Sequence, residues 1–104
     1  MGKQELLSEI KRLVLLQEPT AEIILYGSYA RGDNRPDSDL DLLILLQKDK
    51  ITYADEKRIS YPLYDIEFKT GQLISPMIKS RKEWYGKYKV TPFFKNVTSE
   101  GILL

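Results

Sequence analysis

Two apolar runs joined by a polar, glycine-containing segment most constrain how this chain folds. Residues 21–26 and 39–47 are rich in consecutive bulky aliphatic side chains, and two carboxylates stand at the start of the second run. Such runs are typical of strands buried on both faces, as in a sheet covered by helices. Between them, residues 28–31 can form a short helix, and residues 33–38 have the composition of a turn. We therefore expect an α/β fold built on these two strands.

The remaining segments supply helices and a third strand. Leu, Ile and Val recur at helical spacing near the N-terminus, which predicts a helix that packs on the core. Pro76 lies in a third apolar run and places that strand at an edge or a bulge of the sheet. The expected elements are a helix over residues 3–17, a strand over 72–79, a short helix over 81–88, a last helix from Thr91 to Gly101, and a short apolar tail over 102–104.

The segment 53–69 permits two interpretations. Apolar residues recur there at helical spacing, and Thr52 with Asp55 resembles a capping box, which favours a helix. Pro62 should kink that helix or mark the start of a new one after Ser60. The competing prediction is a strand over residues 64–69, which alternate in polarity. Spacing alone leaves both open.

Composition excludes several classes of function. The chain has 104 residues, which predicts one domain spanning 1–104. Its net charge of +1 argues against general nucleic-acid binding. It contains no cysteine and no histidine, which excludes thiol chemistry and the usual zinc sites. We find no apolar stretch long enough for a membrane span and no signal-peptide pattern, so we expect a cytoplasmic protein.

The polar residues between the two apolar runs suggest a metal site beside a phosphate site. Asp39 and Asp41 are two residues apart on a strand, so their side chains share one face. Two like charges on one face indicate a hard cation between them, such as magnesium, which takes further ligands from water and substrate phosphates. Gly27 and Ser28 lie where a backbone can approach an anion closely. Arg31 can reach a phosphate or pair with a nearby aspartate.

These residues resemble a known family. Gly27-Ser28, a spacer, and Asp39-Leu40-Asp41 followed by apolar residues are similar to the motif of the nucleotidyltransferase superfamily related to DNA polymerase beta. The segments GSYARGD and SDLDLLI resemble the minimal nucleotidyltransferases, and TPFFKNVTSEGILL resembles their terminal helix. The resemblance implies a mixed β-sheet flanked by helices, an α/β (α+β) nucleotidyltransferase fold.

The resemblance also implies an activity and a partner. The family transfers a nucleotidyl group from a nucleoside triphosphate, here expected to be ATP, to a hydroxyl acceptor with two Mg²⁺ ions. Gly27 and Ser28, together with Arg31, would hold the triphosphate, while Asp39 and Asp41 would bind the metal and carry catalysis. Many minimal nucleotidyltransferases are antitoxins beside a HEPN-domain toxin, so a toxin protein is the expected partner and a possible acceptor.

One position departs from the family pattern. A third carboxylate is expected on the third strand, near Ser75, where this chain has none. The nearest upstream acids are Asp65 and Glu67, which face the site only if residues 64–69 form a strand. Two functions therefore stay open: a magnesium-dependent nucleotidyltransferase, or a non-catalytic antitoxin or binding subunit that keeps the fold.

Overall fold

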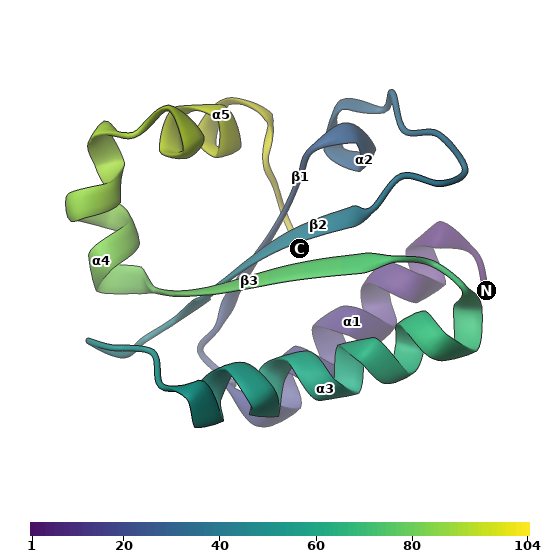
Figure 1. The fold of residues 1–104 in the computed structure, drawn as a ribbon, viewed down its shortest axis with the longest axis horizontal. Helices are drawn as coiled ribbons and strands as arrows, with labels where there is room; N and C mark the ends of the chain where they lie inside the picture. Colours follow the sequence, from purple (N-terminus) through teal and green to yellow (C-terminus); the bar gives the residue numbers. More distant parts are fainter.

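The computed structural model describes residues 1–104 and contains one mixed sheet of four strands in the order β3-β2-β1-β4 (Figure 1). β1 pairs antiparallel with β2 and with β4, and β2 pairs parallel with β3. The elements are, in order, α1 (Lys3–Gln17), β1 (Glu22–Tyr26), α2 (Ser28–Arg31), β2 (Leu40–Leu46), α3 (Tyr53–Thr70), β3 (Ile74–Ser80), α4 (Arg81–Tyr85), the 3-10 helix η1 (Lys87–Val90), α5 (Pro92–Glu100) and β4 (Ile102–Leu103). The α/β class with a mixed sheet flanked by helices is confirmed.

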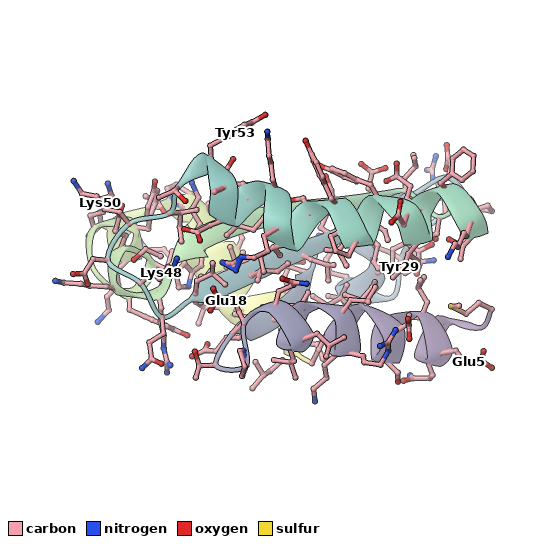
Figure 2. All side chains as sticks on the ribbon, turned by 90° about the horizontal axis from the view of Figure 1, so that it is seen from below. Glu5, Glu18, Tyr29, Lys48, Lys50 and Tyr53 are labelled. Atoms are coloured by element: carbon pink, nitrogen blue, oxygen red, sulfur yellow. The ribbon has the colours of Figure 1, made fainter.

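The helices cover both faces of the sheet. The long helices α1 and α3 lie side by side on one face, where their apolar stripes pack on alternate residues of β2 (Figures 1 and 2). On the other face, Trp84 of α4 and Val97 of α5 pack against Leu43 and Leu45 of β2. Because successive strand residues point to opposite faces, β2 contributes to both cores and is buried almost throughout.

Residues 64–69 belong to a helix, so the strand interpretation is wrong. α3 begins at a capping box between Thr52 and Asp55 and continues through Pro62 to Gly71, whose φ of 75° ends it. Pro62 therefore does not start a new helix. Helical spacing buries Leu63 and Ile66 against the sheet, and it leaves Phe68 92% exposed. In a strand, Ile66 and Phe68 would point to the same face and would be buried to a similar extent.

The two edges of the sheet are formed by β3 and β4. β3 carries Pro76 at an edge, as the missing N–H of proline requires. β4 is a strand that the sequence did not predict, since the expected apolar tail pairs with β1 through Ile102 and Leu103. Gly101 allows this pairing, because a Cβ there would lie 2.7 Å from a side-chain carbon of Ile24.

A polar network ties the start of α3 to the end of α1. Asp55 accepts hydrogen bonds from Lys48 at 2.7 Å and from Arg58 at 2.9 Å, and Arg58 also pairs with Glu18. Figure 2 shows Glu18 and Lys48 at this same end of the two helices. The network satisfies a carboxylate that is only 4% exposed. None of the helices is both long enough and apolar enough to cross a membrane.

Candidate active site

A cleft of about 410 Å³ lies where β1 turns into α2, between that turn, the start of β2, and α5. Figure 1 shows α2 and α5 at the top of the view, away from α1 and α3 below. The cleft is lined by polar side chains and by the aromatic rings of Tyr26 and Phe93. Its lining residues are Tyr26, Gly27, Ser28, Arg31, Asp41, Phe93, Asn96, Val97 and Glu100.

The turn at Gly27 is in direct contact with the carboxylate of Asp41. Gly27 has φ 77° and ψ −158°, a backbone conformation that is open essentially only to glycine. A Cβ built on Gly27 would lie 2.3 Å from Oδ2 of Asp41, which is closer than two such atoms can approach. Glycine is thus needed for the backbone path and also for the space that the carboxylate occupies. The register places this contact, because Asp41 pairs with Tyr26, the residue before the turn.

The negative charge of Asp41 is partly buried and has more acidic than basic neighbours. Burial raises the pKa of Asp41 above its ordinary value, the charges of Asp39 and Glu100 raise it further, and Arg31 opposes them. Asp39 is exposed immediately before β2 and, two residues away, points to the same face. Like-charge proximity costs stability unless a cation offsets it, so the pair has the chemistry of a cation site.

Asp41 lines the cleft together with Glu100, whereas Asp39 is exposed just before β2 and is not among the lining residues. No group of three or more Asp or Glu side chains lies close enough to hold a metal ion. Asp39 and Asp41 therefore fit an ion such as Mg²⁺ that keeps several waters and completes its shell with phosphate oxygens. The first N–H groups of α2, which follow Gly27, lack partners within the helix and suit a phosphate chain.

The third strand carries a serine where a third acid was expected. Asp41 pairs with Ser75 in the parallel ladder, so their side chains share one face. Ser75 is exposed and offers a hydroxyl in place of a carboxylate. Met77 and Lys79 follow it on this face, so no residue of β3 supplies the missing charge.

Asp65 and Glu67 do not join the acid pair. They would serve as metal ligands only if residues 64–69 formed a strand, and the structure places them on α3 instead. α3 packs on the opposite face of the sheet from Asp41, with its buried residues Leu63 and Ile66 against the apolar side of β2. Asp65 is exposed, and Glu67 accepts a hydrogen bond from the backbone N–H of Ile74 at 2.8 Å. The correction follows from the periodicity of a helix.

Arg31 is held from two sides. Its Nε donates to Asp33 at 3.2 Å, which confirms one of the two expected uses of this side chain. Its Nη1 donates to Glu100 at 2.8 Å, across 69 positions of the sequence.

Sequence reasoning missed two residues of the cleft, Glu100 and Asn96, both on α5. Their spacing of four residues on the last helix was the only available signal, and it does not reveal which cleft that helix faces.

A larger hollow of about 630 Å³ lies elsewhere, among α1, α2 and the end of α3. Its polar groups are those of Lys3, Tyr29, Lys69, Thr70 and Gln72, and no carboxylate lines it. The hydroxyl of Tyr29 already donates to Gln72 at 2.7 Å. This hollow offers nothing to a divalent cation, so the smaller cleft is the candidate site.

Comparison with known proteins also indicates nucleotidyl transfer. The profile of a family described as "Nucleotidyltransferase domain" matches residues 3–96. The chain is 34% identical over 100 residues to the Methanocaldococcus jannaschii protein named "Putative protein adenylyltransferase MJ0141", with 94% of each chain covered. It is 36% identical over 83 residues to "Putative protein adenylyltransferase MJ0604" of the same organism, with 80% of this chain and 76% of the relative covered.

A solved structure shares the fold. A chain of a crystal structure described as a toxin-antitoxin with AMP-PNP superimposes with a TM-score of 0.66. The alignment covers 92% of this chain and 69% of that one, at 18% sequence identity. This likeness concerns the arrangement of helices and strands.

Proposed function

Because this chain belongs to the nucleotidyltransferase domain family, we propose that it moves an adenylyl group from ATP, with magnesium, to a hydroxyl group on a partner protein. The observation that carries the proposal is the contact between the Asp41 carboxylate and the Gly27 turn. It brings a cation site and a phosphate site within one cleft. The names of the two relatives support ATP as donor and a protein as acceptor.

The residues of the cleft have distinct roles in this proposal. Gly27 and Ser28 receive the β- and γ-phosphates, since the first amides of a helix lack partners within it. Arg31 adds a guanidinium that matches phosphate oxygens. Asp39 and Asp41 hold magnesium, which, when bound, neutralises the triphosphate and orients the attacking and leaving oxygens. An acceptor hydroxyl would then attack the α-phosphate in line, and pyrophosphate would leave.

The partner is expected to be a toxin protein, as the resemblance to HEPN-associated antitoxins implies. The structural neighbour supports this expectation, since its description is that of a toxin-antitoxin pair with a bound ATP analogue. Ser75, which pairs with Asp41 on the neighbouring strand, is exposed, so an acceptor could reach the surface on that side of Asp41. A hydroxyl from a second protein would approach the α-phosphate from that side.

A second function is favoured by the serine at position 75. In the family a third carboxylate helps to hold the second ion and to activate the acceptor hydroxyl, and here Ser75 stands opposite Asp41. Without that acid the chain would bind ATP and its partner but transfer slowly or not at all. It would then act as a binding antitoxin.

Transfer of label from α-³²P-ATP to a co-expressed toxin partner separates these functions. The enzyme hypothesis predicts labelled partner with the wild type and Mg²⁺, and none with Asp41→Asn. Glu9→Gln, which removes an exposed ion pair on α1 far from the cleft, is the matched control and should retain transfer. Equal labelling by Asp41→Asn would overturn the assigned site. ATP binding without labelling of any partner would favour the binding antitoxin.

A further inference from the structure

The C-terminal helix forms a wall of the cleft. Phe93, Asn96, Val97 and Glu100 recur at the spacing of one helical face, and all four line the cavity. The end of this helix is fixed in place, because the N–H of Gly101 donates to the carbonyl of Val97 at 2.7 Å and β4 then pairs with β1. Glu100 is therefore the last helical residue before a backbone segment bonded to the sheet.

The position of Glu100 is not explained by helix stability. A carboxylate at the C-terminal end of a helix faces the negative end of the helix dipole, which is unfavourable. Glu100 is nevertheless mostly buried, with a side chain 19% exposed, and its one ion pair reaches Arg31 on α2. The pair spans the cleft from the last helix to the turn that follows β1.

The pair fixes Arg31 without using all of its donors. A guanidinium has five N–H donors in a planar fork. Asp33 takes Nε and Glu100 takes Nη1, which leaves three N–H donors, one on Nη1 and two on Nη2. Two carboxylates bound at different edges set the orientation of that plane. A long side chain that is already oriented loses less conformational entropy when it binds a ligand.

We propose that Glu100 is a positioning residue that orients Arg31 so that the remaining guanidinium donors face the triphosphate tail. This inference rests on the proposed function and adds the C-terminal helix to the phosphate site. Glu100 touches neither the metal nor the nucleotide in this role. It acts through Arg31, and its effect depends on the presence of the β- and γ-phosphates.

Calorimetric titration of the full chain with ATP and with AMP, both with Mg²⁺, tests the inference. We expect Glu100→Gln to weaken ATP binding about fivefold to tenfold, because a neutral amide holds the guanidinium less firmly, and to leave AMP binding unchanged. Arg31→Ala should weaken ATP binding more. In the Arg31→Ala background, Glu100→Gln should have no further effect, since the coupling partner is gone. Glu9→Gln, which alters a more exposed Arg–Glu pair on α1 away from the cleft, should leave binding of both nucleotides unchanged.

The failures are distinguishable. Equal weakening of ATP and AMP binding, or an undiminished effect of Glu100→Gln without Arg31, would overturn the positioning role. Tighter ATP binding by Glu100→Gln would overturn it as well, since the glutamate would then compete with phosphate for Arg31. If the wild type binds no ATP, the proposed function fails together with this inference. Circular dichroism of each variant establishes that it is folded before titration.

Discussion

Strand β2 serves two faces of the sheet that differ in what they contribute. On one face Leu40, Leu42, Ile44 and Leu46 are completely covered by α1 and α3. The other face begins with Asp41 and continues beneath α4 and α5. Because strand side chains alternate, a step of one residue separates the groups that hold the fold from those proposed to act on a substrate. The chemistry can therefore change with little cost to the core.

The two aspartates in partly or fully buried positions show the same contrast. Asp55, on the α1–α3 side, has hydrogen bonds from Lys48 and from the backbone N–H of Thr52, which hold its pKa well below its ordinary value. Asp41 has no such partners, and its pKa is raised. Asp55 stabilises the fold, whereas ionised Asp41 destabilises it, as is typical of residues in functional sites.

The largest expected effect comes from neighbouring residues of β2. Leu42→Ala should lower the free energy of unfolding by about 2–5 kcal/mol, because the side chain is fully buried and the cavity cannot close. Asp41→Asn should leave it unchanged or raise it, because a poorly compensated charge is removed. Urea unfolding monitored by Trp84 fluorescence measures both. A large loss of stability in Asp41→Asn would mean that the acid is structural.

Next in size is a pair of glycines. Gly27→Ala should lower the free energy of unfolding by roughly 1–3 kcal/mol, because the φ and ψ of this position are strained for any other residue. The added Cβ should also displace the Asp41 carboxylate and abolish Mg²⁺-dependent ATP binding. Gly32 has a similar φ of 79°, but a Cβ there would meet nothing within 4 Å. Gly32→Ala should cost about 1 kcal/mol through its φ alone and retain binding. Equal ATP affinity in the two variants would contradict the proposed phosphate site.

The pH dependence of stability should differ in sign between the two aspartates. An unfolded aspartate titrates near a pKa of about 3.9. The lowered folded pKa of Asp55 means that its contribution is present above that value and is lost as pH falls below it. The raised folded pKa of Asp41 means the opposite, so its ionisation reduces stability as pH rises through this range.

Unfolding of Asp55→Asn and Asp41→Asn between pH 3 and 7 measures this difference. At pH 7 Asp55→Asn should lose roughly 1.5–3 kcal/mol, the typical value of a hydrogen bond to a charged group, while Asp41→Asn should keep or gain stability. At pH 3 Asp41→Asn should approach the wild type, whereas Asp55→Asn should stay less stable, because the lowered folded pKa of Asp55 keeps its carboxylate ionised in the folded state. Changes of the same sign at pH 7 would mean that the two environments do not differ as described.

The smallest effect concerns the third strand. Ser75→Asp would place a third carboxylate opposite Asp41, and we expect a gain in Mg²⁺ affinity of about threefold to tenfold. Ser75→Asn, which has the same shape without the charge, is the control. Isothermal titration with MgCl₂ measures the gain. If Ser75→Asp and Ser75→Asn bind alike, the register does not bring this position into the metal site.

Local patterns predicted most of the fold and the acid pair. Thr91 and Pro92 begin α5 and Gly101 ends it, as cap chemistry requires. The ambiguity over residues 64–69 arose because alternation and helical spacing both fit six residues, and only burial on the sheet distinguishes them. Glu100 was missed for a different reason. Its contact with Arg31 depends on how β4 pairs with β1, and no local signal carries that long-range information.

The central claim is that the Asp39–Asp41 pair and the Gly27 turn form one site for magnesium and a triphosphate. Titration of the chain with ATP, with and without Mg²⁺, tests it most directly when the wild type is compared with the double variant Asp39→Asn, Asp41→Asn. We predict that the wild type binds ATP only when Mg²⁺ is present and that the double variant does not bind it under either condition. Magnesium-independent binding of equal strength by both proteins would contradict the claim.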